Sequence, residues 1–254
     1  GLLYEFELAD GRVEQPDPWQ SAASVSFQYL GSILYDPEGY GKAIGPEGIA
    51  LVYHDLFGDP WSVDLPNIPV SLEQPELTLP FSGEDEWAFT GGPHTGWGTL
   101  YPWAALDFAP GTDTSGCVPT TLPTVAMAGG MVVRSETGVV ILDLDADGDE
   151  RTGWNLLYLH VATEGRAKTG AILQTGDIIG YPSCEGGTAT GTHIHIARKY
   201  NGEWIPADGA LPFILDGWVC HYGDAPYDGT LTKGGEIVIA CSCSDATSHI
   251  RAGK

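Results

Sequence analysis

The stretch Thr192-His193-Ile194-His195-Ile196-Ala197 alternates polar and apolar side chains. Successive side chains of a β-strand point to opposite faces, so this alternation predicts a strand. His193 and His195 would share one face, while Ile194 and Ile196 would face the core. Two imidazoles this close suit one metal ligand and one group that handles the proton of a bound water. Taken alone, a His-x-His pair is more often a pair of surface or hydrogen-bonded histidines.

Strand-like segments with turn signals between them fill the chain from about residue 76 onward. Beside the His-x-His strand, they are residues 131–134, 138–142, 154–161, 177–181 and 203–205. The first two flank a Ser-Glu-Thr-Gly turn and predict a hairpin, and the last would pair with the His-x-His strand across the Asn201-Gly202 turn. The connections are too short for long helices. The sequence therefore predicts an all-β fold with an antiparallel sheet or sandwich core.

The first 75 residues of the 254 contain few residues that could carry chemistry. Segments 24–30 and 48–53 alternate as strands do, and residues 60–80 are punctuated by proline, which favours an extended connector. We expect an N-terminal β-rich extension over residues 1–75 and the main domain over 76–254. The role of the extension is left open between a pro-region, a binding module and a part of the core.

The chain is strongly acidic, with 34 Asp and Glu against 11 Lys and Arg and a net charge of −23. Such a charge repels nucleic acid and anionic lipid, so we expect neither as a partner.

No apolar run approaches the roughly 20 residues of a membrane helix, so membrane insertion is not expected. Because the first residue is glycine, we expect a processed chain. The oligomeric state is not indicated.

Five cysteines occur, none in a Cys-x-x-Cys pair: Cys117, Cys184, Cys220, Cys241 and Cys243. We interpret them as disulfide partners in an oxidising compartment, which predicts a secreted or cell-surface protein. The preferred pairs are Cys117 with Cys184, and Cys220 with either Cys241 or Cys243. One cysteine is then left over, and the connectivity stays open because sequence does not determine it.

Three further residues are candidates for the same site as the His-x-His pair. His94 lies in the turn-rich stretch Gly91–Trp97, where a loop could present it as a ligand. Asp107 lies in the apolar segment Trp103–Pro110, and a buried carboxylate is costly unless it is paired or binds a metal. His160 ends an apolar strand, where a lone histidine is more often structural.

Together these segments resemble the lysostaphin/LytM-type zinc metalloendopeptidases, whose fold is called a duplicated hybrid motif. Four segments carry the resemblance: Leu106-Asp107-Phe108-Ala109-Pro110, Tyr158-Leu159-His160, Thr175–Tyr181, and Gly191-Thr192-His193-Ile194-His195. The resemblance covers roughly residues 80–200 and implies this fold. One departure is the first spacing: the family usually places its first histidine four residues before the aspartate. Here thirteen positions separate His94 from Asp107, which predicts an inserted loop whose aromatic residues could line a cleft.

The resemblance implies that His94, Asp107 and His195 hold Zn²⁺. Two histidines and a carboxylate leave an open fourth position, as a catalytic zinc requires. His160 and His193 correspond to the family's pair that orients and deprotonates water. The sequence lacks His-Glu-x-x-His, so this histidine pair would replace a glutamate base.

A second metal is suggested by residues 143–150, Asp-Leu-Asp-Ala-Asp-Gly-Asp-Glu. The segment begins like a calcium loop, but its twelfth position would be Trp154 instead of a bidentate glutamate. We favour a solvated acidic loop and keep Ca²⁺ at Asp143–Asp149 as the alternative.

The leading hypothesis is therefore a secreted zinc-dependent endopeptidase. The resemblance implies peptidoglycan cross-bridges or glycine-rich peptides as substrates. The alternative is a non-catalytic cell-wall binding or structural module that keeps the peptidase fold. The presence of all five metal-site residues favours the enzyme, and zinc content would separate the two.

Overall fold

The computed structural model divides the chain into two compact units, Gly1–Val70 and Ser71–Lys254. It describes residues 6–7, 13–14, 68–69, 71–83, 85–97, 102–111, 115–243 and 245–253. In the first unit, the described residues form an antiparallel pair of short strands, β1 (Phe6–Glu7) and β2 (Val13–Glu14). The strands expected at 24–30 and 48–53 lie outside the described residues. The division into 1–75 and 76–254 stays a prediction.

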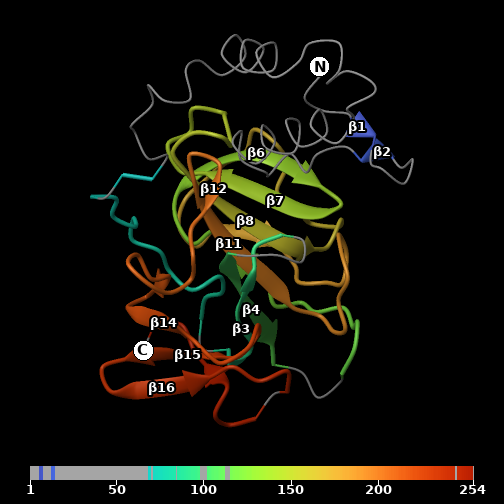
Figure 1. Ribbon diagram of the computed structural model, residues 1–254. Coiled ribbons are helices and arrows are strands. Elements are labelled where there is room, and N and C mark those ends of the chain that lie inside the picture. Colours follow the sequence, from blue (N-terminus) through green and yellow to red (C-terminus); the bar gives the residue numbers. More distant parts are fainter. Residues whose placement is uncertain are drawn as a thin grey trace. The chain divides into compact units, whose positions relative to one another are not determined.

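The second unit is organised around one nine-stranded antiparallel sheet, with the order β17-β3-β4-β11-β8-β7-β6-β9 and β12 paired to β11 (Figure 1). Its strands are β3 (Trp87–Thr95), β4 (Trp103–Pro110), β6 (Gly130–Glu136), β7 (Gly138–Asp143), β8 (Trp154–Val161), β9 (Ile172–Leu173), β11 (Ile194–Tyr200), β12 (Glu203–Trp204) and β17 (His249–Ile250). The centre of the sheet, β4-β11-β8, brings together three segments that are far apart in sequence.

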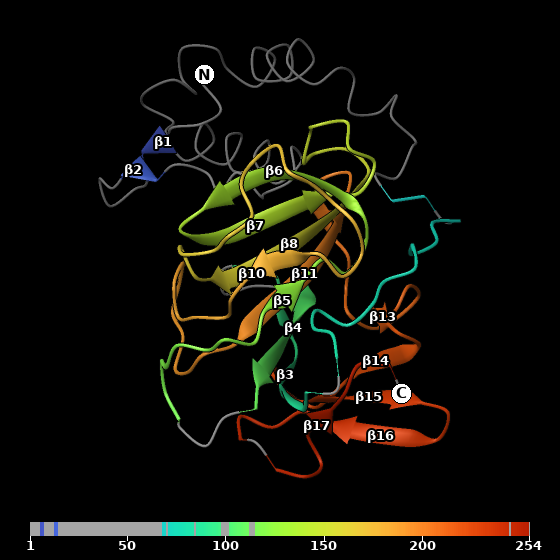
Figure 2. The ribbon, with the colours of Figure 1, turned by 180° about the vertical axis from the view of Figure 1, so that it is seen from behind.

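Two smaller sheets complete the unit. Strands β13 (Ile214–Leu215), β14 (Trp218–Tyr222), β15 (Gly229–Lys233) and β16 (Glu236–Ile239) form a four-stranded antiparallel sheet. Strands β5 (Thr124–Val125) and β10 (Ile178–Gly180) form a pair that crosses one face of the large sheet (Figure 2). The described residues contain no helix, so none of them could cross a membrane as one. The predicted all-β antiparallel fold is confirmed.

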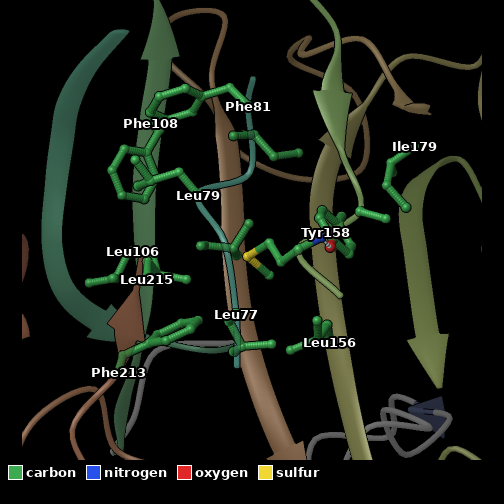
Figure 3. Close-up of a cluster of buried hydrophobic side chains, with 14 of the residues drawn as sticks. Leu77, Leu79, Phe81, Leu106, Phe108, Leu156, Tyr158, Ile179, Phe213 and Leu215 are labelled. Carbon is green, nitrogen blue, oxygen red and sulfur yellow. Dashed lines mark hydrogen bonds between the residues drawn. The ribbon is translucent and has the colours of Figure 1, made fainter. Parts of the chain in front are cut away.

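The core lies against one face of the large sheet. The fully buried side chains of Phe108, Ile194, Ile196 and Tyr158 come from its central strands. The segment 77–81 runs across this face and adds Leu77, Leu79 and Phe81 (Figure 3). Because strand side chains alternate, the opposite face of β4 and β11 is left for polar groups. The strand pattern therefore separates the core from the site.

Most of the predicted strands are confirmed. β6 and β7 form the expected hairpin, β8 spans the expected residues, and β12 pairs with β11 beyond Asn201-Gly202. Ile194 and Ile196 face the core, as the alternation required.

One disulfide prediction is confirmed and the other is wrong. Cys117 is bonded to Cys184, but Cys241 is bonded to Cys243 and Cys220 is a free, buried thiol. Cys220 lies on β14 with its side chain in the core, whereas Cys241 and Cys243 follow β16 as close neighbours at the surface. Two cysteines separated by one residue can meet without any rearrangement of the sheet, whereas the side chain of Cys220 is buried in the core.

Candidate metal centre

Asp107 occupies the middle of the candidate site because β4 lies between β3 and β11. In the ladder Asp107 is opposite His195 on β11 and opposite Gly91 on β3. A Cβ atom at Gly91 would lie 2.7 Å from Oδ2 of Asp107, so only glycine leaves room for the carboxylate. β3 and β4 form an antiparallel hairpin with register shifts around His94. The chain reverses between His94 and Asp107, which is why thirteen positions of sequence separate residues that are neighbours in space.

Three buried ligand atoms from three strands converge at this point. Nε2 of His94 lies 3.0 Å from Nδ1 of His195 and 3.3 Å from Oδ1 of Asp107. Nδ1 of His195 lies 3.1 Å from the same oxygen. The three ligand atoms are close enough to one another to bind a single metal ion. The structure thus brings together all three residues that the sequence predicts as ligands.

The outer nitrogen of each imidazole is bonded to a backbone carbonyl. Nδ1 of His94 lies 2.8 Å from the carbonyl oxygen of Gly92, and Nε2 of His195 lies 3.0 Å from that of Gly96. A carbonyl oxygen only accepts, so these nitrogens carry the ring protons. In neutral rings, the nitrogens that face each other and Asp107 therefore carry lone pairs. This is the tautomer that metal-binding histidines adopt.

The charge state of the cluster favours a cation. Burial alone would raise the pKa of Asp107, but His94 and His195 outweigh it and hold that pKa well below its usual range. Burial alone would lower the pKa of His94, and Asp107 reverses this and raises it. Burial lowers the pKa of His195. Oδ1 of Asp107 is buried and has no hydrogen-bond donor among the described residues. In the metal-free chain a proton on His94 balances this ionised carboxylate, and a metal cation at the same place would take over that role.

The dimensions of this triangle fit zinc. Ligand atoms about 2.0–2.2 Å from a tetrahedral zinc lie about 3.3–3.6 Å from each other. The observed separations of 3.0, 3.1 and 3.3 Å are within a few tenths of an ångström of that range. Two imidazole nitrogens and one carboxylate oxygen are also a ligand set that zinc accepts. The residues therefore fit the metal that the sequence predicted.

His160 reaches the site through a β-bulge. In the β7–β8 ladder, Val139 pairs with Leu159 and Gly138 pairs with Val161, which leaves His160 without an opposite residue. Its φ of +67° is in the left-handed region. In a regular strand His160 would face the core, like Tyr158. The bulge shifts the alternation, so Val161 enters the core and His160 lines the site.

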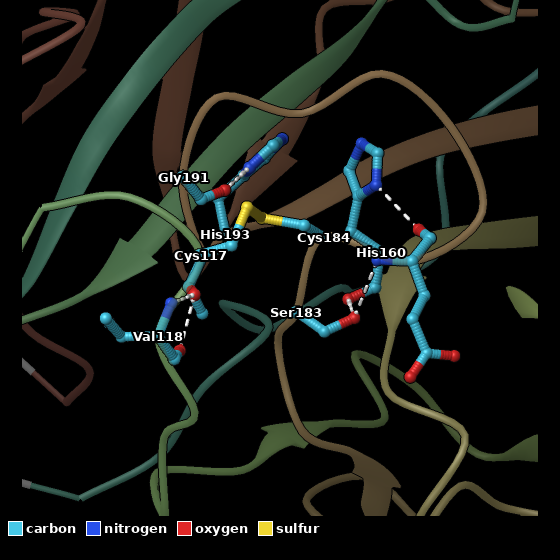
Figure 4. Close-up of a disulfide and its surroundings, with 9 residues drawn as sticks. Cys117, Val118, His160, Ser183, Cys184, Gly191 and His193 are labelled. Atoms are coloured by element: carbon cyan, nitrogen blue, oxygen red, sulfur yellow. Dashed lines mark hydrogen bonds between the residues drawn. A yellow bond between two sulfur atoms is a disulfide. The ribbon is translucent and has the colours of Figure 1, made fainter.

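His160 and His193 lie next to each other at the rim of the triangle. Their ring centroids are 4.5 Å apart, and Nε2 of His193 lies 3.8 Å from Oδ2 of Asp107. Nδ1 of His160 donates to the carbonyl of Glu185 at 2.8 Å, and Nδ1 of His193 donates to that of Gly191 at 2.8 Å (Figure 4). Burial and the neighbouring His193 lower the pKa of His160 to about 4, so its ring is neutral at ordinary pH. The Nε2 atom of His160 can then accept a proton.

A cavity of about 710 Å³ opens beside the triangle. One wall is the run 186–193, which consists of small residues before His193, and Trp97 forms part of another wall. Trp97 belongs to the loop in which the sequence placed cleft-lining aromatic residues, and residues 98–101 of that loop lie outside the described residues. Asp107 is the one acidic residue among the described residues that line the cavity, and none of them is lysine or arginine.

Tyr227 is a site residue that sequence reasoning missed. It comes from the loop between β14 and β15, and its ring is stacked on His94 with centroids 4.1 Å apart. Its backbone is also tied to β3, since Gly92 N–H donates to the Tyr227 carbonyl at 2.7 Å. No local pattern marks this residue, because its position depends on how the four-stranded sheet packs against β3.

The acidic loop after β7 satisfies its own carboxylates. Asp143 is buried, and its two oxygens accept the backbone N–H groups of Asp145 at 3.3 Å and Gly148 at 2.9 Å. Asp147 in turn accepts from the N–H of Asp149 at 2.7 Å. Asp143, Asp145 and Asp147 do lie close together, but nothing else supports calcium at this loop. The solvated-loop interpretation is the one we retain.

No family model matches the sequence, and no curated protein is significantly similar to it. Solved structures do match. A structure described as a novel M23 metalloprotease, pseudoalterin, from the deep sea has a TM-score of 0.54 and 23% identity, and the match covers 67% of this chain and 96% of that one. The catalytic domain of lysostaphin from Staphylococcus simulans gives a TM-score of 0.32 with 20% identity over 49% and 89% of the two chains. LytU gives a TM-score of 0.31 with 24% identity over 54% and 87%.

The first of these matches is strong enough to compare folds, and it spans nearly the whole of the matched protein. The fold expected from the four matching sequence segments and the fold observed therefore agree. This chain has the β-sheet fold of the M23 metallopeptidases, to which its motifs pointed.

Proposed function

We propose that this protein is a zinc-dependent endopeptidase with His94, Asp107 and His195 as its metal ligands. The observation that carries the proposal is the triangle of buried ligand atoms, 3.0–3.3 Å apart, whose ring protons all point away from its centre. Such an arrangement places three electron pairs together in a dry environment. It is costly without a cation and favourable with one.

We assign His160 and His193 to proton transfer. When bound, a zinc ion supplies Lewis acidity, which polarises a carbonyl and makes water a stronger nucleophile at neutral pH. Nε2 of either histidine can take the proton that the attacking water loses, and can return a proton to the leaving amine. Each ring is held by a backbone carbonyl at Nδ1, so the accepting nitrogen is fixed toward the cavity.

The substrate that we propose is peptidoglycan cross-bridges or other glycine-rich peptides. The wall of the cavity formed by residues 186–191 carries only Gly, Ala and Thr side chains, and the described part of the lining offers no lysine, arginine or glutamate to bind a charged side chain. An extended chain of small, uncharged residues fits such a lining. The two disulfides support a site of action in an oxidising environment, which favours secretion or display at the cell surface.

The test combines metal analysis with activity. Purified protein should contain close to one zinc per chain, and it should hydrolyse purified peptidoglycan and pentaglycine. A chelator should abolish hydrolysis, and added zinc should restore it. Zinc-loaded protein that binds peptidoglycan without cleaving any peptide bond would instead establish a non-catalytic module. Protein that takes up no zinc would refute the metal assignment.

A further inference from the structure

The two proposed proton-transfer histidines are held by two separate loops that a single disulfide joins. Cys117 and Cys184 are 67 positions apart in sequence, and their Cα atoms are 5.8 Å apart. Neither cysteine lies in a β-strand, and each is flanked by residues that bond to the segment carrying one of the histidines (Figure 4).

On the Cys184 side, the flanking residues fix both the backbone and the ring of His160. The backbone N–H of Ser183 donates to the carbonyl of His160 at 2.7 Å, and the Ser183 hydroxyl donates to the same oxygen at 3.0 Å. Glu185 accepts the ring proton of His160 through its backbone carbonyl. Cys184 thus lies between the two residues that orient His160.

Glu185 is itself held in place by hydrogen bonds to Thr163. Its carboxylate accepts the backbone N–H of Thr163 at 3.0 Å and also the Thr163 hydroxyl. These bonds lower the pKa of Glu185 below its usual value. Thr163 lies three residues after His160, so the loop that carries Glu185 is fastened to the end of β8 at two points.

On the Cys117 side, the flanking residues fix the start of the His-x-His strand. The carbonyl of Gly116 accepts the N–H of Thr192 at 3.0 Å. The hydroxyl of Thr192 accepts the N–H of Val118 at 2.9 Å and donates to the carbonyl of the same residue. Thr192 directly precedes His193, so Cys117 lies between the two residues that hold the backbone next to that histidine.

The metal triangle is supported differently. His94, Asp107 and His195 lie within strands β3, β4 and β11, and their backbones are held by ladder hydrogen bonds. His160 lies in a bulge, and His193 precedes β11, where it forms only an isolated antiparallel bridge with Ser183, so ladder bonds constrain both residues less. The disulfide therefore adds a covalent link to this single bridge, between parts of the site that lie outside the regular ladder.

We propose that the Cys117–Cys184 disulfide is a positioning element for His160 and His193, and that it acts on proton transfer without contributing to metal binding. This proposal rests on the proposed peptidase function. A displacement of about 1 Å at a reacting group can cost roughly a hundredfold in rate. Without the disulfide, kcat should fall by about ten- to a hundredfold, whereas the zinc content and KM should stay within about threefold of the native values.

The experiment compares the full chain with the double variant Cys117→Ala/Cys184→Ala, both loaded with zinc. Zinc stoichiometry, kcat, KM and the pH profile of kcat are measured on pentaglycine. Val132→Ala, in the core beneath β6 and away from the cavity, is the control for a general loss of stability. It should lower the unfolding midpoint and leave kcat and its pH profile as they are. Loss of zinc in the double variant, or an unchanged kcat, would overturn the proposal.

A second readout does not depend on activity. The proton on Nδ1 of His160 is hydrogen-bonded to Glu185, so it should give an observable, slowly exchanging NMR signal in the native chain. The signal should be lost or broadened in the double variant and kept in Val132→Ala. If the native chain proves to have no peptidase activity, the proposed function fails and this signal alone decides whether the disulfide positions His160. A signal that persists in the double variant overturns the positioning role.

Discussion

Nε2 of His94 lies 3.0 Å from Nδ1 of His195, although 101 positions separate the two residues in sequence. Two neutral imidazoles do not attract each other through nitrogens that both lack a proton. Their approach is explained if a cation occupies the space that they share with Asp107. The roles proposed for the five site residues lead directly to a first prediction.

Substitution at a ligand and at a proton-transfer residue should have different effects. His195→Ala should abolish both zinc binding and hydrolysis, because it removes one of three metal ligands. His160→Ala should leave zinc in place and slow turnover by about 10²–10⁴-fold, the usual contribution of a positioned acid–base group. Metal analysis and steady-state kinetics on pentaglycine measure both. Loss of zinc from the His160 variant would show that the roles are wrongly divided.

The ring of Tyr227 should contribute to zinc affinity by holding His94 in place. Tyr227→Phe keeps the stacked ring and should keep the affinity. Tyr227→Leu removes the stack and should weaken zinc binding by about tenfold, the lower end of what is lost when a ligand's supporting contact is removed. Competition against a zinc-binding dye gives both dissociation constants. Equal weakening in the two variants would show that the hydroxyl group matters and the ring does not.

The acidic loop should be dispensable for hydrolysis. Replacing Asp143, Asp145 and Asp147 together by Asn keeps one accepting side-chain oxygen at each position, although Asp143 then loses one of its two bonds to backbone N–H groups. Turnover and zinc content should stay within about twofold of the native values, and addition of calcium should not change them. A triple variant that keeps its zinc but loses turnover would contradict this expectation.

Cys220 should be unreactive in the folded protein. Its side chain is fully buried, and burial raises the pKa of its thiol, so the reactive thiolate is scarce. Iodoacetamide at pH 8 should modify no cysteine under native conditions. In denaturant without reductant it should add one group per chain, at Cys220. Peptide mass spectrometry that finds Cys220 in a disulfide would refute the observed pairing.

Tyr158→Phe should destabilise the core. The Tyr158 hydroxyl accepts the backbone N–H of Met127 at 2.7 Å, and both groups are buried. Without that oxygen, the N–H loses its partner in an apolar environment, which costs about 1–3 kcal/mol of unfolding free energy. Urea denaturation gives the change. Tyr200→Phe, at a partly exposed ring, is the matched control and should change stability by less than about 0.5 kcal/mol.

Sequence alone determined the strands at residues 131–142, 154–161 and 192–205 and the face on which two of the histidines lie, whereas it placed His94 in a loop and the structure places it in strand β3. The alternation at residues 192–197 predicts that His193 and His195 point away from the core, because the period of two is a local property of an extended backbone. The same local pattern would place His160 beside Tyr158 in the core. A bulge at His160, visible only in the pairing of β7 with β8, moves it to the site.

Only the tertiary structure decided which distant segments of the chain contact each other. The register of β3, β4 and β11 sets Asp107 opposite both Gly91 and His195, and the packing of the four-stranded sheet brings Tyr227 onto His94. The pairing of Cys241 with Cys243 likewise follows from the burial of Cys220. Alternation and turn residues act over a few positions of chain, whereas register and burial depend on which strands become neighbours when the core closes.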